Sequence, residues 1–424
     1  MTKGTYLKVV DILKNIIAGS KFEGHVYCVG GCVRDLLLGR SIKDIDIVVD
    51  LPNGGIELAE WLKNGGYTKG SVVTYPHFGT AMFVLKDMPD VELESVQTRK
   101  EVYRDMESRN PETVFGSIED DRGRRDFTYN ALYNNVSTGK LDDFNDGKSF
   151  IDLDNNILKT CGEPDLIFSD DPLRILRCIR FKVRYGSTIE DKTYKGMFDN
   201  VHRLAILSKE RIQDEVVKML SCENAHDAVD LLFKIGAIKY IFPNIEEPYD
   251  ASVYSSRIQT VGSTDPRVNL AILLKWSKDP KADMMGLKFS NDYINYVMFL
   301  LEKIYTIYSA LGIYDWYLRE AQLYCGTYER FLDKCKMISV SSNNITYLDM
   351  SKIIEKTDQM IKNGTAMFGY KLPVDGNDVM NELGIGPSAE IKRILDELLD
   401  YACENPGATR EDFLSKIKMV WNRQ

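Results

Sequence analysis

The stretch from Val26 to Asp50, VYCVGGCVRDLLLGRSIKDIDIVVD, constrains the fold of this chain more than any other. It opens with VYCV, a short apolar run of residues that favour β-strands. Gly30 and Gly31 follow at the point where a strand would pass into a helix. Glycine has no side chain, so its backbone N–H group can approach an anion closely. The pattern predicts a strand, a phosphate-binding turn and a helix.

The second half of this stretch predicts two carboxylates on one face of a strand. Val33, Leu36 and Leu37 are expected on one apolar face of the short helix, and residues 44–49 then read DIDIVV. Side chains two residues apart on a strand share a face, so Asp44 and Asp46 are expected to point the same way. The apolar residues between and after them are expected to face the core.

Neighbouring carboxylates repel each other, so ionising both is costly unless a cation lies between them. Oxygen ligands favour a hard cation, and Mg²⁺ is usually held by one or two carboxylates together with substrate phosphates. We therefore predict that Asp44 and Asp46 bind Mg²⁺ and are catalytic. The alternative is a solvated face of an edge strand that binds no metal.

The composition is that of an ordinary globular protein. The chain has 424 residues, of which 28% are charged and 44% are hydrophobic. This length is enough for about two to four domains. No apolar run reaches about eighteen residues, so no membrane is expected among its partners. The first residues, MTKGTYLKVVDILKNII, predict an amphipathic helix rather than a secretion signal, which favours the cytoplasm or an organelle whose targeting peptide is missing.

The cysteines and the charge exclude further classes of site. Eight cysteines are scattered without any C-x-x-C spacing, which predicts reduced thiols and no zinc. The net charge of −9 argues against polyanion binding over the whole surface. A local exception is RILRCIRFKVR at 174–184, which carries five basic residues and no acid. This run predicts either an RNA or nucleotide contact or an ordinary basic helix face.

The stretch GGCVRDLLLGRSIKDIDI resembles the first signature of the class II tRNA nucleotidyltransferases and the related bacterial poly(A) polymerases. These families belong to the polymerase-β-like nucleotidyltransferase superfamily. The resemblance implies an α+β protein whose N-terminal head has a mixed sheet with helices and is followed by an all-α neck, body and tail. It also implies that Gly30, Gly31 and Arg34 hold nucleotide phosphates.

Four parts are predicted along the chain. They are a nucleotidyltransferase head over 1–150, a neck for base recognition over 151–225, a helical body over 226–340 and a helical tail that binds tRNA over 341–424. The helix-length apolar periods after residue 225 support the last two parts.

A second signature, RRDFTYNAL at 124–132, is similar to the family's RRDFT-x-NA motif. Arg124 and Arg125 offer two guanidinium groups to phosphate oxygens. Asp126 and Asn130 are able to hydrogen-bond a ribose hydroxyl. All four are predicted to bind nucleotide. The alternative for Asp126 is a structural helix N-cap.

A third signature, DDPLR at 170–174, resembles the motif with which class II enzymes read the incoming base. A carboxylate from Asp171 would accept from an exocyclic amino group while Arg174 donates to a ring nitrogen, and only cytosine and adenine offer that pair. Arg177 extends the row along the helix, which Ser169 or Asp170 is expected to cap. The alternative is an intrahelical ion pair between Asp171 and Arg174 that is worth about 0.3 kcal/mol.

Two further features come from the resemblance. Glu94 aligns with the acidic residue that the family places on the strand beside its aspartate pair, so it is carried as a third, weaker metal ligand. Residues 99–121 are expected to form a mobile loop of about twenty residues. The family's flexible loop lies here and favours complete CCA addition or A addition, although simple disorder is the alternative.

The combined signatures predict a template-independent enzyme that adds C, C and A to the 3′ end of tRNA from CTP and ATP and releases pyrophosphate. The alternatives are a poly(A) polymerase or an A-only enzyme with the same chemistry. A more distant alternative is a catalytically inactive RNA-binding scaffold. The predicted partners are the tRNA 3′ end and the two nucleotides.

Overall fold

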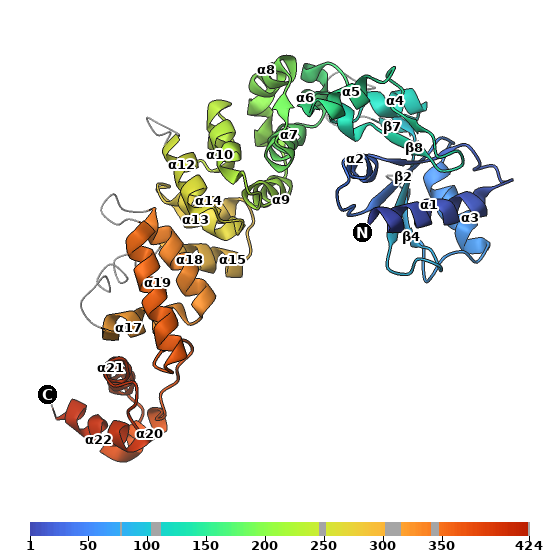
Figure 1. Ribbon diagram of the computed structural model, residues 1–424. Coiled ribbons are helices and arrows are strands. Elements are labelled where there is room, and N and C mark those ends of the chain that lie inside the picture. Colours follow the sequence, from blue (N-terminus) through green and yellow to red (C-terminus); the bar gives the residue numbers. More distant parts are fainter. Residues whose placement is uncertain (77–78, 103–111, 246–251, 302–314, 341–346, 423–424) are drawn as a thin grey trace. The chain divides into compact units, whose positions relative to one another are not determined.

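The chain forms two compact units in the computed structural model, which describes residues 1–76, 79–102, 112–245, 252–301, 315–340 and 347–422 (Figure 1). The first unit contains Met1–Met219 and Leu231–Tyr240, and the second contains Leu220–Asp230 and Ile241–Gln424. The predicted division into head, neck, body and tail is finer than these two units and stays a prediction.

A mixed sheet organises the first unit. Seven strands of the described chain pair in the order β3-β4-β5-β2-β1-β8-β9. β2 and β5 are parallel, and the other neighbours are antiparallel. The strands are β1 (Val26–Val29), β2 (Ile45–Val49), β3 (Val73–Tyr75), β4 (Thr80–Val84), β5 (Glu92–Gln97), β8 (Tyr133–Asn135) and β9 (Leu141–Asp142). The mixed sheet and the many helices confirm the predicted α+β class.

Two helices pack against the sheet of the first unit through their apolar faces. α1 (Lys3–Ile17) buries one face, and its Tyr6 hydroxyl accepts a hydrogen bond from Asn134 Nδ2 on β8 at 3.0 Å. α3 (Gly54–Asn64) packs against β2, β4 and β5. A Cβ added at Gly55 would lie 2.6 Å from the Cα of Val96, so only glycine lets α3 approach β5 this closely.

The short helix α2 (Gly31–Leu37) buries only part of the predicted face. Val33 is fully buried, but Leu37 is 39% exposed, whereas Arg34 and Asp35 are both 5% exposed. The two charged side chains are buried because they pair with each other, with Arg34 Nε 2.9 Å from Asp35 Oδ1. The expectation that Leu37 faces the core was therefore wrong.

The expected mobile loop over 99–121 is partly ordered. Its ends form an antiparallel hairpin of β6 (Arg99–Val102) and β7 (Glu112–Phe115), followed by α4 (Ile118–Gly123). Residues 103–111, which include Tyr103 of the loop signature, lie outside the described residues. The loop prediction was too long, because the flanking residues pair with each other across the connection.

Helices make up most of the remaining first unit. They are α5 (Lys148–Asp154), α6 (Pro164–Asp170), α7 (Leu173–Tyr185), α8 (Asp191–Asn200) and α9 (Lys209–Leu220), with α10 (Ala225–Lys234) and α11 (Ile238–Ile241) at the boundary between the units. β10 (Ile157–Leu158) and β11 (Thr188–Ile189) add a two-residue parallel pair. Ser169 and Asp170 do not cap α7, because they end α6, and Asp171 Oδ1 accepts from the Leu173 N–H instead.

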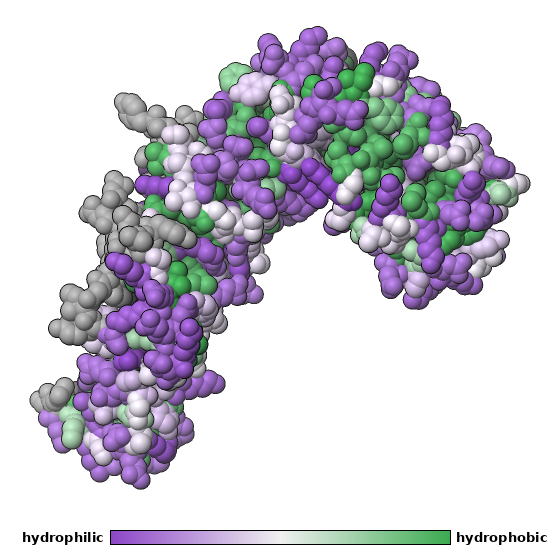
Figure 2. All heavy atoms as spheres, viewed as in Figure 1, coloured by the Kyte–Doolittle hydropathy of each residue, from purple (hydrophilic) through white to green (hydrophobic). Residues whose placement is uncertain are grey.

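The described elements after α11 are all helices. They are α12 (Ser252–Val261), α13 (Pro266–Leu274), α14 (Pro280–Gly286), α15 (Asn291–Leu301), α17 (Asp315–Cys325), α18 (Tyr328–Ser339), α19 (Tyr347–Lys362), α20 (Gly376–Leu383), α21 (Ala389–Glu404) and α22 (Arg410–Trp421). Hydrophilic residues cover most of the surface drawn in Figure 2. Of the helices described, none combines the length and apolar character needed to cross a bilayer.

Candidate active site

One cavity of about 510 Å³ in the first unit collects most of the predicted site residues. Its walls come from the β1–α2 turn, the start of β2, residues 125–130 and α7. The predicted residues that line it are Gly30, Gly31, Arg34, Asp44, Asp46, Arg125, Asp126, Asn130 and Arg177. Arg124, Asp171, Arg174 and Glu94 do not line it. Segments that are more than a hundred residues apart in sequence thus meet at one site.

The glycine turn forms one wall of the cavity. Gly30 has φ +77° and precedes the first residue of α2. A Cβ added at Gly30 would stand 3.7 Å from Arg125 Nη1 and 3.9 Å from Asp46 Oδ2. The missing side chain therefore keeps open the space between a guanidinium group and a carboxylate, where a phosphate and its counter-ion would fit.

The guanidinium group of Arg34 contacts other side chains of the protein in this structure. Its guanidinium donates to both carboxylate oxygens of Asp35 and to Asn130 Oδ1, and it stacks over the Tyr185 ring with 4.6 Å to the ring centroid. Through its hydrogen bond to Oδ1, Arg34 orients Asn130 at the cavity wall. The prediction that it holds phosphate directly is not tested by these contacts.

The carboxylate pair lies at the start of β2. The strand begins at Ile45, so Asp44 stands just before it rather than within it, and both aspartates line the cavity. In the parallel pairing of β2 with β5, Asp46 is the register partner of Glu94. The register therefore puts a third carboxylate on the strand next to Asp46.

The carboxylate of Asp46 is harder to ionise than an ordinary aspartate. The pKa of Asp46 is raised to about 6, first because the surrounding protein removes it from bulk water and then because Glu94 and Asp44 repel its charge, while Arg125 opposes the rise. Nowhere in the described chain do three or more His, Cys, Asp or Glu side chains form a group that could hold a metal by themselves. The donor set instead fits a cation that takes its other ligands from substrate phosphates and water.

Asp121 on α4 anchors both arginines of the RRDFT signature. Arg124 Nη2 donates to Asp121 Oδ1 at 2.6 Å, and Arg125 Nη2 donates to Asp121 Oδ2 at 2.8 Å. The Tyr133 hydroxyl donates to the same carboxylate at 3.1 Å. Burial pushes the pKa of Asp121 upward, but the two guanidinium groups outweigh it and hold the pKa below its ordinary value. Arg125 is thus fixed at the cavity wall, and Arg124 turns away to donate to the Arg99 carbonyl.

Asp126 joins the signature segment to α7. Arg177 donates to Asp126 Oδ2 from Nε at 2.9 Å and from Nη2 at 2.6 Å, and Asn130 Nδ2 donates to Asp126 Oδ1 at 3.1 Å. Burial would raise the pKa of Asp126, yet Arg177 keeps it lowered and therefore ionised. Its side chain accepts from the Phe127 N–H but does not cap the short 3-10 helix that follows.

The predicted base-reading pair makes other contacts in this structure. Asp171 Oδ2 accepts from Arg211 Nη2 at 2.8 Å, whereas Arg174 donates to the carbonyls of Ile167 and Arg124 at 3.0 and 2.8 Å. Arg174 also pairs with Asp170 at 3.1 Å. The alternative of an Asp171–Arg174 ion pair is therefore not what these side chains form. Their role in reading a base stays a prediction.

Several cavity residues were missed by sequence reasoning. They are Cys32, Asp35, Lys43, Phe181, Tyr185 and Lys218. Arg180 and Arg184 also line the cavity, and they belong to the basic run at 174–184 for which an RNA or nucleotide contact is one of the two predictions. Arg180 is held by Glu215 on α9 at 2.6 Å. The missed anchor Asp121 precedes Arg124 and Arg125 by three and four residues, a spacing that predicts helical ion pairs.

Comparison with known families and proteins agrees with this geometry. Residues 26–159 match the poly A polymerase head domain, and residues 186–247 match the probable RNA and SrmB-binding site of polymerase A. A tRNA nucleotidyltransferase of Schizosaccharomyces pombe is 27% identical, with 96% of this chain and 93% of the relative covered. A CCA-adding enzyme of Oceanobacillus iheyensis is 28% identical, with 100% and 99% covered.

Solved structures share the fold over nearly the whole chain. The CCA-adding enzyme of Bacillus stearothermophilus in complex with CTP has a TM-score of 0.77 at 22% identity, covering 99% of this chain and 98% of that one. The Thermotoga maritima CCA-adding enzyme complexed with tRNA has a TM-score of 0.69 at 22% identity, covering 98% and 95%. At this level of identity the likeness shows a common fold.

Proposed function

Because this chain belongs to the family of CCA-adding tRNA nucleotidyltransferases, we propose that it adds C, C and A to the 3′ end of tRNA from CTP and ATP and releases pyrophosphate. The observation that carries the proposal is one cavity that combines an aspartate pair, a glycine turn and the RRDFT segment. The relatives' names, which state CCA addition, support the same reaction.

Enzymes of this family generally use a divalent metal, and we infer Mg²⁺ at Asp44 and Asp46 with Glu94 as a weaker third ligand. The oxygen-only donors and the raised pKa of Asp46 fit a hard cation. Such an ion, when bound, lowers the pKa of the tRNA 3′ hydroxyl and binds the triphosphate.

The chain's own side chains would orient the substrates. The Gly30 N–H already donates to the Leu132 carbonyl at 3.2 Å, so what this glycine offers is space: no side chain fills the position beside Arg125 where a phosphate would lie. Asp126 and Asn130 would bind the ribose, since both line the cavity and hold each other in place. Arg34, Arg124 and Arg177 would act mainly by positioning these groups.

Base selection is assigned to Asp171 and Arg174. Each would have to turn from its present partner toward the nucleotide, and each keeps acceptor or donor capacity beyond the bonds it makes here. Selection of cytosine and adenine by one carboxylate and one guanidinium needs no nucleic-acid template.

The partners and location follow from the same proposal. The substrates are tRNA, CTP and ATP, without zinc and without a membrane. A cytoplasmic location is supported by the cysteines, no two of which form a disulfide in the described chain.

An incorporation assay tests the function. Labelled CTP and ATP are offered with tRNAs that end before CCA and after CC. We expect C, C and then A on the first substrate and A on the second. An enzyme that ignores CTP would instead be A-adding and would contradict the proposal. Asp46→Ala should reduce incorporation by at least about a hundredfold because the metal site is lost, while tRNA binding persists. Full incorporation by that variant would reject metal catalysis by this pair.

A further inference from the structure

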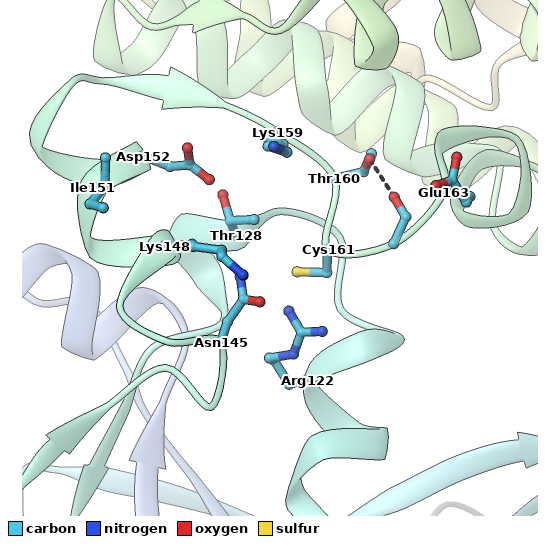
Figure 3. Close-up of a pocket in the computed structure, with 11 residues that line it drawn as sticks. Arg122, Thr128, Asn145, Lys148, Ile151, Asp152, Lys159, Thr160, Cys161 and Glu163 are labelled. Atoms are coloured by element: carbon cyan, nitrogen blue, oxygen red, sulfur yellow. Dashed lines mark hydrogen bonds between the residues drawn. The ribbon is translucent and has the colours of Figure 1, made fainter.

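A second cavity, of about 390 Å³, lies in the first unit and shares no lining residue with the one described above. It is formed by α4, α5, the segment 159–163 and Thr128 (Figure 3). Its volume is roughly ten times the 30 Å³ that one water occupies in the liquid, so it can hold a small organic molecule.

The two cavities lie on either side of the RRDFT segment. Asp126 and Asn130 line the first cavity, and Thr128, between them, lines the second. The Thr128 N–H donates to the Lys159 carbonyl at 2.9 Å, and the Cys161 N–H donates to the Asp126 carbonyl at 3.4 Å. The wall of the second cavity is therefore hydrogen-bonded directly to the backbone that presents the nucleotide-binding side chains.

Two polar atoms at this cavity are buried without a partner. Thr128 is 3% exposed, and its Oγ1 has no hydrogen bond; neither does the buried Nε of Arg122. An unmade hydrogen bond at a buried polar atom destabilises the folded chain, so native proteins usually satisfy such atoms. A ligand with oxygen atoms would satisfy both.

The charges around the cavity indicate the chemistry of that ligand. Three cationic side chains line it, Arg122, Lys148 and Lys159, against the carboxylates of Asp152 and Glu163. Lys148 also lies 3.5 Å from Asp146 and Lys159 3.5 Å from Glu190, both outside the cavity lining, so a phosphate would compete with Asp146 for Lys148. Figure 3 shows the ends of Lys148, Asn145 and Arg122 turned toward one another. A guanidinium, an ammonium and an amide together suit phosphate oxygens.

The carboxylates would repel a second anion but accept hydrogen bonds from hydroxyl groups. Asp152 makes no ion pair with any other described residue, so its oxygens are available to a ligand. In Figure 3 Asp152 lies on the Thr128 side of the cavity, away from Arg122. The lining thus has a cationic end and a hydroxyl-accepting end.

We propose that this cavity binds a small phosphorylated ligand that also carries hydroxyl groups, of the class of sugar phosphates and nucleoside monophosphates. The phosphate lies between Arg122 and Lys148, and the hydroxyl groups face Asp152. Because the cavity wall carries Asp126 and Asn130 on its other side, occupancy would alter nucleotide binding in the first cavity. This site is separate from the proposed reaction.

Ribose 5-phosphate is the probe, and its binding to the full chain is measured by calorimetry. We expect saturable binding that weakens by about tenfold or more in Lys148→Gln and in Arg122→Gln, since each variant removes a charged hydrogen bond. Lys148 is exposed, so its variant should fold even if Arg122→Gln does not. Lys8→Gln, an exposed change that lines neither cavity, should bind within about twofold of the parent chain.

Gly30→Ala distinguishes binding in the second cavity from binding in the first, because its new Cβ projects into the first cavity. Ribose 5-phosphate should bind this variant as it binds the parent. Loss of binding in Gly30→Ala, undiminished binding in Lys148→Gln, or no saturable binding at all would overturn the proposal. Equal affinity for inorganic phosphate would overturn the assignment of hydroxyl recognition. None of these measurements depends on CCA addition, so they fail or succeed independently of it.

Discussion

Charged side chains in and beside the first cavity are held in place by hydrogen bonds to one another. Asp121 receives hydrogen bonds from Arg124, Arg125 and Tyr133 and is fully buried. Asp126 is held by Arg177 in the same way. A buried charge is stable only when it is paired, so these contacts fix the guanidinium and carboxylate groups before substrate arrives. The charged groups around the cavity are therefore fixed in place in the folded chain.

Asp121 should make the free energy of unfolding depend on pH. Its pKa is lowered in the folded chain, so its stabilising effect is present above its unfolded pKa of about 4 and is lost as pH falls through the folded pKa. At pH 7 we expect Asp121→Asn to lower the free energy of unfolding by about 3 kcal/mol, because two guanidinium groups lose their buried partner.

Urea unfolding at neutral and acidic pH measures this effect. The difference between Asp121→Asn and the parent should shrink as the pH is lowered below about 4. Glu119→Gln, an exposed change on the same helix, should alter stability by less than about 0.5 kcal/mol. A difference that stayed constant from pH 7 to acid would show that Asp121 does not act through its charge.

Arg174 should determine how strongly the enzyme prefers CTP to UTP. Arg174→Lys is expected to reduce the preference for CTP over UTP by about tenfold, because lysine cannot present two fixed donors. The measurement is the ratio of kcat/KM for the two nucleotides. Arg177→Lys is the control, since Arg177 holds Asp126 and its loss should lower both rates together. If Arg174→Lys kept the parent ratio, base reading would lie elsewhere.

At the scale of elements, close contacts between backbones decide where the site forms. α3 lies against β5 because Gly55 has no side chain, and β5 in turn holds Glu94 beside Asp46. α4 presents Asp121 to the segment that follows it, and α7 brings Arg177 to Asp126. The site therefore depends on the packing of three helices, α3, α4 and α7, with one sheet.

Gly55→Ala tests the contact between α3 and β5. The new Cβ would lie 2.6 Å from the Cα of Val96, so α3 must move away from the sheet. We expect the free energy of unfolding to fall by about 1–3 kcal/mol. Gly4→Ala on α1, where the nearest atom would be 3.7 Å away, should leave stability unchanged or slightly higher. Equal effects in the two variants, measured by urea unfolding, would contradict the contact.

At the scale of the whole molecule, both cavities belong to the first of the two compact units. Every residue that lines either cavity lies between Gly30 and Lys218 in the first unit. The second unit consists of helices with a core of its own, in which Phe413, Ile394 and Val379 are buried together. The second unit is proposed to bind tRNA, because the predicted tRNA-binding tail, residues 341–424, falls within it.

A fragment of residues 1–240 separates these roles. We expect it to bind CTP with an affinity within about threefold of the full chain, because it keeps the complete cavity. Addition to tRNA should fall by about a hundredfold or more, since the proposed tRNA-binding part is removed. Circular dichroism is the control that checks whether the fragment is folded. A folded fragment that adds nucleotides to tRNA at the parent rate would contradict the role of the second unit.

By itself the sequence determined the glycine turn, the aspartate pair and the RRDFT segment, because these depend on local periodicity and on motifs of fixed spacing. The fold class followed from the family resemblance that these motifs carry. The tertiary structure alone decided which partners the long charged side chains take. Asp121 as an anchor, Arg34 bound to Asn130, and Asp171 and Arg174 engaged away from the cavity are contacts of this kind. A buried charge pairs with whatever group the folded chain brings within hydrogen-bond distance, and residues far apart in sequence meet only after the sheet and helices have packed.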